Sequence, residues 1–180
     1  MIRYGVHPFS SLVNSIGIKF VLLPPGSFMM GSPETEPGRY DDEIYHKVTL
    51  TNRFYVSTTV VTQGFSTIAV DYDDPNLDLM GWNCGNSEHR LHRVAKKAPN
   101  KWGLYDMHGN VCEWCQDWYG DYPSAAVVNP MGPESGEKKV TRGGSYKAYA
   151  RDCRSASRFW GWPNIFRGGP DDGLRLVRTL

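Results

Sequence analysis

The stretch that decides the fold is Gly103-Leu-Tyr-Asp-Met-His-Gly-Asn-Val-Cys-Glu-Trp-Cys-Gln-Asp-Trp118, which mixes large rings with oxygen-bearing side chains. Trp and Tyr bury a large apolar area while each keeps one polar group, so these rings predict part of a core. The carboxylates of Asp106 and Glu113 flank a Gly-Asn kink, and irregular loops of carboxylate and carbonyl oxygens hold calcium. The spacing is not that of an EF-hand. On the residues alone, the simpler interpretation is therefore that these carboxylates are solvated or cap a turn.

Length and charge narrow the classes of function. A chain of 180 residues predicts one domain with a sizeable core, preceded by a loosely held lead-in over residues 1–17. Twenty basic and 19 acidic residues give a net charge of +1, so nucleic acid or an anionic membrane is not an expected partner. No run approaches the roughly 18 apolar residues of a membrane span. The N-terminus is a poor signal peptide, which predicts a cytoplasmic protein or one exported by another route.

The composition predicts many loops and short strands, since six Trp and ten Tyr are combined with 19 Gly and 12 Pro. Apolar and β-branched runs predict a hairpin from residues 18–23 and 28–30, and another from residues 48–50 and 54–56. We expect the acidic segment 33–46 to be a solvated loop. The closing run, residues 173–177, predicts a single strand.

The pair Cys112 and Cys115 forms a C-x-x-C motif, for which two interpretations are open. Zinc would need two further ligands, which Cys84, His89, His92 or Cys153 could supply only if the fold brings them close. A thioredoxin-type redox pair would sit at a helix N-terminus after a strand, which this sequence context does not suggest. Buried structural thiols are the favoured interpretation, because free Cys behaves as a small hydrophobic residue.

An aromatic segment near the C-terminus, residues 159–172, carries Phe159, Trp160, Trp162 and Phe166 among Gly and Pro. Its rings follow neither the strand period nor the helix period, which indicates a loop. The rings either fill the domain's own core or form a contact surface, and exposed aromatic patches mark binding sites. We expect at least one or two of these rings to be exposed.

Six motifs occur in an order that resembles the formylglycine-generating-enzyme, or sulfatase-modifying factor, family. They are Pro25-Gly-Ser-Phe-Met-Met-Gly-Ser32, Val61-Thr-Gln63, Asn100-Lys-Trp-Gly-Leu-Tyr-Asp-Met-His-Gly-Asn-Val-Cys-Glu-Trp114, Arg142-Gly-Gly-Ser-Tyr146, Cys153-Arg-Ser-Ala156 and Gly173-Leu-Arg-Leu-Val177. The resemblance implies an α+β domain with a variant of the C-type lectin fold, short strands and much irregular structure. It also implies a structural calcium ion, with side chains from Asp106 and Glu113 and carbonyls from Gly109 and Val111.

Two departures from the family pattern argue against enzymatic activity. Enzymes of the family bind copper through a cysteine pair, and the first of these positions is Ala148 here, while the second is Cys153. A lone thiolate cannot supply the two-coordinate soft site that copper(I) favours. The middle is also shortened, because a family helical segment is missing between about Val70 and Leu79. The alternative is an oxidase that uses copper, Cys153 and the retained Ser145.

The C-terminal motifs also resemble the variable proteins of diversity-generating retroelements, which vary C-terminal loop residues to bind different ligands. We therefore expect a non-catalytic protein whose region 142–177 binds a protein or other macromolecule. The resemblance implies a ligand surface made of Tyr146, Lys147, Ala148, Tyr149, Asp152, Ser157, Phe159, Trp160, Trp162, Asn164, Ile165 and Phe166. Rigid aromatic side chains on a fixed scaffold supply contact area at a low entropy cost.

Overall fold

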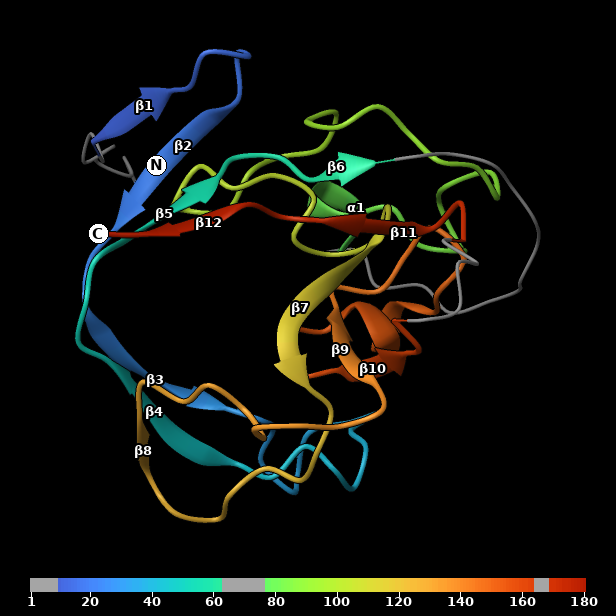
Figure 1. Cartoon of the computed structure of the whole chain (residues 1–180). Coiled ribbons are helices and arrows are strands. Elements are labelled where there is room, and N and C mark those ends of the chain that lie inside the picture. The colour runs from blue at the N-terminus through green and yellow to red at the C-terminus, as the bar shows by residue number, and fades with distance from the viewer. Residues whose placement is uncertain (1–9, 63–76, 164–168) are drawn as a thin grey trace, which may run out of the picture.

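The computed structural model describes residues 10–62, 77–163 and 169–180, and these form three small β-sheets with long irregular connections (Figure 1). The strands are β1 (Ser11–Val13), β2 (Lys19–Leu23), β3 (Gly26–Met30), β4 (His46–Leu50), β5 (Phe54–Ser57), β6 (Val61–Thr62), β7 (Cys112–Trp118), β8 (Val127–Val128), β9 (Lys139–Arg142), β10 (Arg158–Gly161), β11 (Asp172–Leu174) and β12 (Val177–Thr179). One helical turn, α1 (Leu77–Met80), and a 3₁₀ turn, η1 (Ala150–Cys153), complete the regular structure.

The opening stretch supplies β7, the central strand of a five-stranded sheet in the order β10-β9-β7-β11-β6. β7 pairs antiparallel with β9 and parallel with β11. Gly109 has a φ of 79°, and an added Cβ would collide with the carbonyl of Trp82, so the turn requires glycine. Asn110, fully buried, fastens this turn by bonding both the amide and the carbonyl of His92. The stretch is thus a tight turn that runs into the middle of a sheet.

The expected hairpins are wrong, although the strands themselves exist. β2 pairs with β1 and β5, while β3 pairs with β4, so the Pro24–Pro25 corner separates two sheets. β4 and β5 likewise belong to different sheets, β3-β4-β8 and β1-β2-β5-β12. Figure 1 shows the three-stranded sheet lying apart from the four-stranded one. Alternating apolar residues predicted where strands form but not which strands pair.

The closing run is also different from the expectation of a single strand. It divides into β11, in the five-stranded sheet, and β12, which pairs with β5 in the four-stranded sheet. Figure 1 shows this segment crossing from one sheet to the other. Arg175 lies between the two strands, so its position at the junction of the sheets is set by this division.

The core is distributed over small clusters. One joins Val21, Val56 and Leu104, with Trp102 and Met107 packed against it. A second joins Leu77, Ala150 and Cys153. Within the part of the chain that the structure describes, no helix is both long and apolar enough to cross a membrane.

Candidate functional site

The predicted calcium loop lies where the opening stretch enters β7. Asp106 is buried in the left-handed region, with a φ of 54°. Its Oδ2 accepts a hydrogen bond from the Ala95 amide at 2.8 Å, whereas its buried Oδ1 has no hydrogen-bond partner among the described residues. Burial raises the pKa of Asp106 above its ordinary value. An uncompensated buried carboxylate oxygen is costly, and a bound cation would satisfy it.

Glu113, the other predicted carboxylate ligand, forms a buried ion pair with Arg175. Arg175 Nε lies 2.9 Å from Glu113 Oε2 and Arg175 Nη2 lies 2.5 Å from Oε1. Burial raises the pKa of Glu113, against the lowering effect of Arg175, and the charge of Asp106 adds to the increase. A carboxylate has about four lone-pair sites, so Glu113 can accept these bonds and still contact a cation. Calcium at this turn therefore stays a prediction, in which Glu113 would bind the ion alongside Arg175.

The two predicted carbonyl ligands belong to the same segment. Gly109 O accepts a hydrogen bond from the Val111 amide at 2.9 Å, and Val111 itself is fully buried. Across the described residues, no group of three or more His, Cys, Asp or Glu side chains is placed to hold a metal. A calcium ion at this turn would thus depend on two carboxylates supplemented by carbonyl oxygens, as calcium sites allow.

The C-x-x-C residues lie on β7 and are free thiols, as are Cys84 and Cys153. Side chains three residues apart on a strand point to opposite faces, which separates Cys112 from Cys115. Burial raises the pKa of Cys112 to about 12 and that of Cys115 to about 11, so both are neutral thiols. Both residues are half-buried, and a structural role for their thiols stays a prediction.

Cys153, the retained position of the family pair, is buried beneath the Gly143–Gly144 turn. An added Cβ at Gly144 would come within 2.6 Å of the Cys153 sulfur, which requires glycine there. Burial, followed by the nearby Cys112, raises the pKa of Cys153. Ser145 lies in hydrogen-bond contact with the Cys112 thiol. The structure thus places the half-buried Cys112 near the buried residues Ser145 and Cys153.

The predicted ligand-binding residues divide by exposure. Tyr146, Asp152 and Ser157 are buried, so their side chains do not reach the surface in this structure. Lys147, Ala148, Tyr149 and Phe159 are half-buried. Trp160 and Trp162 are 45% and 40% exposed. The remaining three positions, Asn164, Ile165 and Phe166, lie outside the described residues.

The two exposed tryptophans form a small aromatic platform at the edge strand β10. Their ring centroids are 6.2 Å apart in an edge-to-face arrangement. Lys138 Nζ lies 3.2 Å from the Trp160 ring centroid and 5.0 Å from that of Trp162. A cation over an aromatic face is attracted by the ring quadrupole, so Lys138 orients both rings. Sequence reasoning missed Lys138, since it precedes β9 and only strand pairing brings it beside β10.

The acidic segment 33–46 is largely the exposed loop that we expected, but one of its carboxylates is buried. Glu43 is fully buried and accepts a bond of 2.6 Å from Arg154 Nη2 and another of 2.6 Å from the Ser32 hydroxyl. Tyr40 donates to Asp152 at 2.6 Å and packs edge-on against Phe159. The segment therefore stabilises the predicted ligand-binding region through its contacts with Arg154, Asp152 and Phe159. The local charge pattern does not reveal this role.

Comparison with known proteins gives one family and a fold. Residues 69–180, well over half of the chain, match the family model of the sulfatase-modifying factor enzyme 1-like domain. A serine/threonine-protein kinase pkn1 from Chlamydia pneumoniae is 48% identical over 69 residues, which cover 36% of this chain and 11% of the kinase. The formylglycine-generating enzyme of Bos taurus is 43% identical over 70 residues, covering 37% of this chain and 19% of the enzyme. The matched segments thus span only a minor part of either relative.

Two solved structures have the same fold over nearly the whole chain. Treponema denticola variable protein 1 gives a TM-score of 0.76 at 19% identity, covering 96% of this chain and 99% of that one. PvdO from Pseudomonas aeruginosa gives 0.77 at 21% identity with the same coverage. At these identities the likeness concerns the fold alone.

Proposed function

The chain belongs to the sulfatase-modifying factor family, and on that premise we propose that it is a non-catalytic member that binds a macromolecular ligand. Its fold is the α+β, C-type-lectin-like variant that the motifs imply, with short strands and much irregular structure. The observation that carries the proposal is the Trp160–Trp162 platform with Lys138 over it. Trp is strongly enriched among residues that dominate binding energy at protein interfaces.

The scaffold beneath the platform supports this proposal, because hydrogen bonds and ion pairs hold it to several other segments of the chain. Arg142 Nη1 donates to the carbonyls of Ala156 and Ser157, at 2.9 and 2.7 Å. Arg154 joins Glu36 and Glu43 from the acidic segment. Aromatic groups on a rigid framework lose little conformational entropy on binding. The motifs around Arg142 and Arg154 therefore position the exposed tryptophan rings, and not a catalytic group.

The absent cysteine at Ala148 supports the non-catalytic assignment. Ala148 packs against the cluster of Leu77, Ala150 and Cys153, where the family's first copper ligand would be expected from the motif.

The proposed ligand is a protein or another macromolecule, because the platform is an exposed surface and not a deep cleft. Variation of the ligand between related chains would follow the retroelement pattern. That pattern predicts a reverse transcriptase nearby in the genome and a near-repeat of the C-terminal coding region that differs at adenines.

The binding proposal is tested by a selection from a displayed peptide library on the immobilised chain. Binders enriched by the wild-type chain should lose at least tenfold in affinity, about 1.4 kcal/mol, on the double variant Trp160→Ala/Trp162→Ala. The melting temperature should shift by no more than a few degrees, because both rings are substantially exposed. Ile16→Ala, at a 77% exposed apolar residue elsewhere, is the matched control and should leave binding unchanged. Large destabilisation by the double variant would mean that these rings are core, and the proposal would fail.

A second candidate is an oxidase that uses Cys153, and the nearby Cys112 is the observation that favours it. Copper bound by these thiols would supply dioxygen activation, while Ser145 would orient the Cys112 sulfur. Anaerobic titration with copper(I) distinguishes the two functions. Uptake of one equivalent that disappears in Cys153→Ser would support the oxidase, and no uptake by the wild-type chain would eliminate it.

A further inference from the structure

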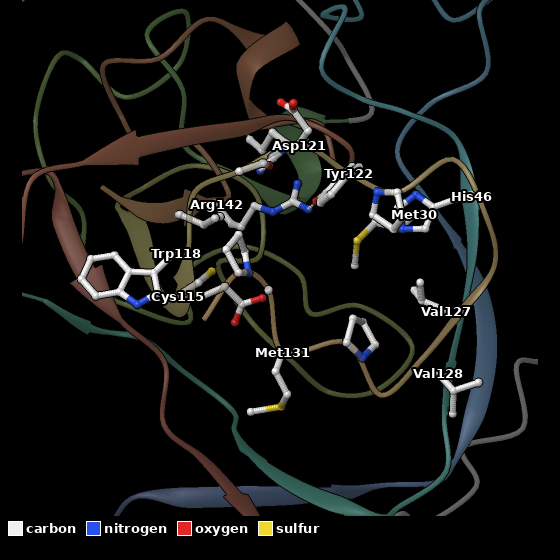
Figure 2. A pocket seen from close by; sticks show the side chains of 18 residues that line it. Met30, His46, Cys115, Trp118, Asp121, Tyr122, Val127, Val128, Met131 and Arg142 are labelled. Carbon is white, nitrogen blue, oxygen red and sulfur yellow. Dashed lines mark hydrogen bonds between the residues drawn. The ribbon is translucent and has the colours of Figure 1, made fainter. Parts of the chain in front are cut away.

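A cavity of about 530 Å³ is lined by residues from distant parts of the chain, among them His46, Trp118 and Met131 (Figure 2). Its lining comes from the end of β3, the start of β4, β7, β9, β10 and the connection that runs through residues 120–133. Cavities of roughly 300–1,000 Å³ hold small molecules. Neither Trp160 nor Trp162 lines this cavity, so it is a feature separate from the platform.

The polar floor of the cavity is Arg158, which is 4% exposed. Its Nη2 donates to the Gly120 carbonyl at 2.6 Å. Nε and Nη1 are buried and have no hydrogen-bond partner among the described residues. The nearby carboxylate, Asp42, stands 3.9 Å from Nη1 and already accepts a bond of 2.6 Å from the Tyr119 hydroxyl. A buried guanidinium with two unsatisfied donors is costly unless an anion completes its shell.

Arg158 is held in place for such an anion. Its guanidinium lies 4.4 Å from the ring centroid of Tyr119 and 4.0 Å from that of Tyr122. Arg142, also lining the cavity, donates to Tyr122 through Nη2, and Figure 2 shows this pair side by side. Stacking on aromatic faces leaves the edge of a guanidinium free to donate to oxygen. The guanidinium of Arg158 is therefore held in a fixed position in the lining of the cavity.

The other side chains that line the cavity determine the charge and polarity of a ligand that fits. Apolar side chains line much of the cavity, among them Met30, Val127, Val128, Pro130, Met131 and Pro133. Two carboxylates, Asp117 and Asp121, also border it, and Figure 2 shows the Asp121 carboxylate turned away from the other labelled side chains. Their negative charge disfavours a dianion such as phosphate. The fitting ligand carries a single negative charge and an apolar body.

We propose that this cavity binds a small amphipathic monocarboxylate, with its carboxylate on Arg158 and its apolar chain against Met30, Val127 and Met131. A carboxylate accepts charge-assisted hydrogen bonds from guanidinium N–H groups. The apolar chain gains free energy by leaving water for these walls. The site is a small-molecule site, in addition to the macromolecular surface proposed above.

Octanoate is the probe, and octanamide is its uncharged counterpart of the same length. By isothermal titration or amide chemical shifts, octanoate should bind the full chain with a Kd of about 1 mM or tighter. Octanamide should bind at least about tenfold more weakly, since it cannot supply the anion. Equal affinity for the two would overturn the proposal, because Arg158 would then contribute nothing. Failure of octanoate to bind would overturn it as well.

A variant at the cavity wall locates the binding without disturbing the core. Arg158→Gln removes the buried charge but can unfold the chain, so Met131→Glu, at a 72% exposed residue, is the decisive variant. It places a charged group against the apolar chain of octanoate and should weaken octanoate binding at least about tenfold while leaving the melting temperature unchanged. Leu79→Glu, at a 68% exposed residue on α1, is the matched control and should not alter the affinity. Unchanged affinity in Met131→Glu would show that octanoate binds elsewhere and would refute the site.

Discussion

Glu43 and Arg154 link two parts of the chain that are more than a hundred residues apart. Burial alone would raise the pKa of Glu43, but the hydrogen bonds from Arg154 and Ser32 hold it below its ordinary value of 4.5. A carboxyl group whose pKa is lowered by folding stabilises the folded state only while it is ionised. Its contribution is complete above the unfolded pKa and is lost as the pH falls through the folded pKa.

We therefore expect Glu43→Gln to destabilise the chain at pH 7 by on the order of 2 kcal/mol, because charge-assisted bonds are lost. The difference from the wild type should shrink as the pH falls below the ordinary value of 4.5 and through the lowered pKa of folded Glu43. Urea unfolding of both chains at pH 7, 5 and 3 measures this. Glu34→Gln, at an exposed position of the same segment, should show little difference at any pH. A difference for Glu43→Gln that is constant with pH would contradict the ion-pair assignment.

For single residues, the sequence predicts which side chains carry charge or metal-binding groups better than it predicts which of them are buried. Asp106 and Glu113 were recognised as carboxylates of one loop, and the structure does bring them into one electrostatic neighbourhood. Arg175 as the partner of Glu113 could not be predicted, since 62 residues separate them and only the parallel pairing of β7 with β11 brings them together. The buried state of Tyr146 was equally hidden, because its neighbours Lys147 and Tyr149 are half-buried.

The closing segment, residues 172–179, connects two sheets, because β11 belongs to the five-stranded sheet and β12 to the four-stranded sheet. Arg175, between them, also donates to the carbonyls of Ser57 and Tyr105, at 3.0 and 2.9 Å. One guanidinium thus joins β5, the opening stretch and β7. The sequence predicted a strand here but not its division, because strand propensity is local whereas the choice of partner depends on long-range packing.

We expect Arg175→Met to lower the free energy of unfolding by about 3–5 kcal/mol, because it leaves the buried Glu113 carboxylate without its cation. Arg178→Met, at an exposed position on β12, should change it by less than about 0.5 kcal/mol. Chemical denaturation followed by tryptophan fluorescence measures both. If the two variants were equally mild, the junction would not be stabilised by Arg175.

For the molecule as a whole, the apolar core is divided into small clusters, so the stability of the fold also depends on polar contacts and bound ligands. The described residues form small apolar clusters joined by turns, ion pairs and long connections, with few residues in helices. Such an arrangement gains from any ligand that binds only the folded chain. The turn at Asp106 is the place where calcium would have this effect, since it connects the opening stretch to the central strand and contains an unsatisfied carboxylate oxygen.

Chelation should therefore lower the stability of the whole domain first, and ligand binding only as a consequence. Calcium at about a hundred times its Kd stabilises by about 2.7 kcal/mol, and 1 kcal/mol corresponds to about 2–4 °C for a domain of this size. We expect EGTA to lower the melting temperature by about 5–10 °C, and added calcium to restore it. Asp106→Asn should abolish the response to EGTA, whereas Asp121→Asn, an exposed carboxylate elsewhere, should retain it. A melting temperature unchanged by EGTA in the wild-type chain would remove calcium from this turn and leave Arg175 as the sole cation that neutralises Glu113.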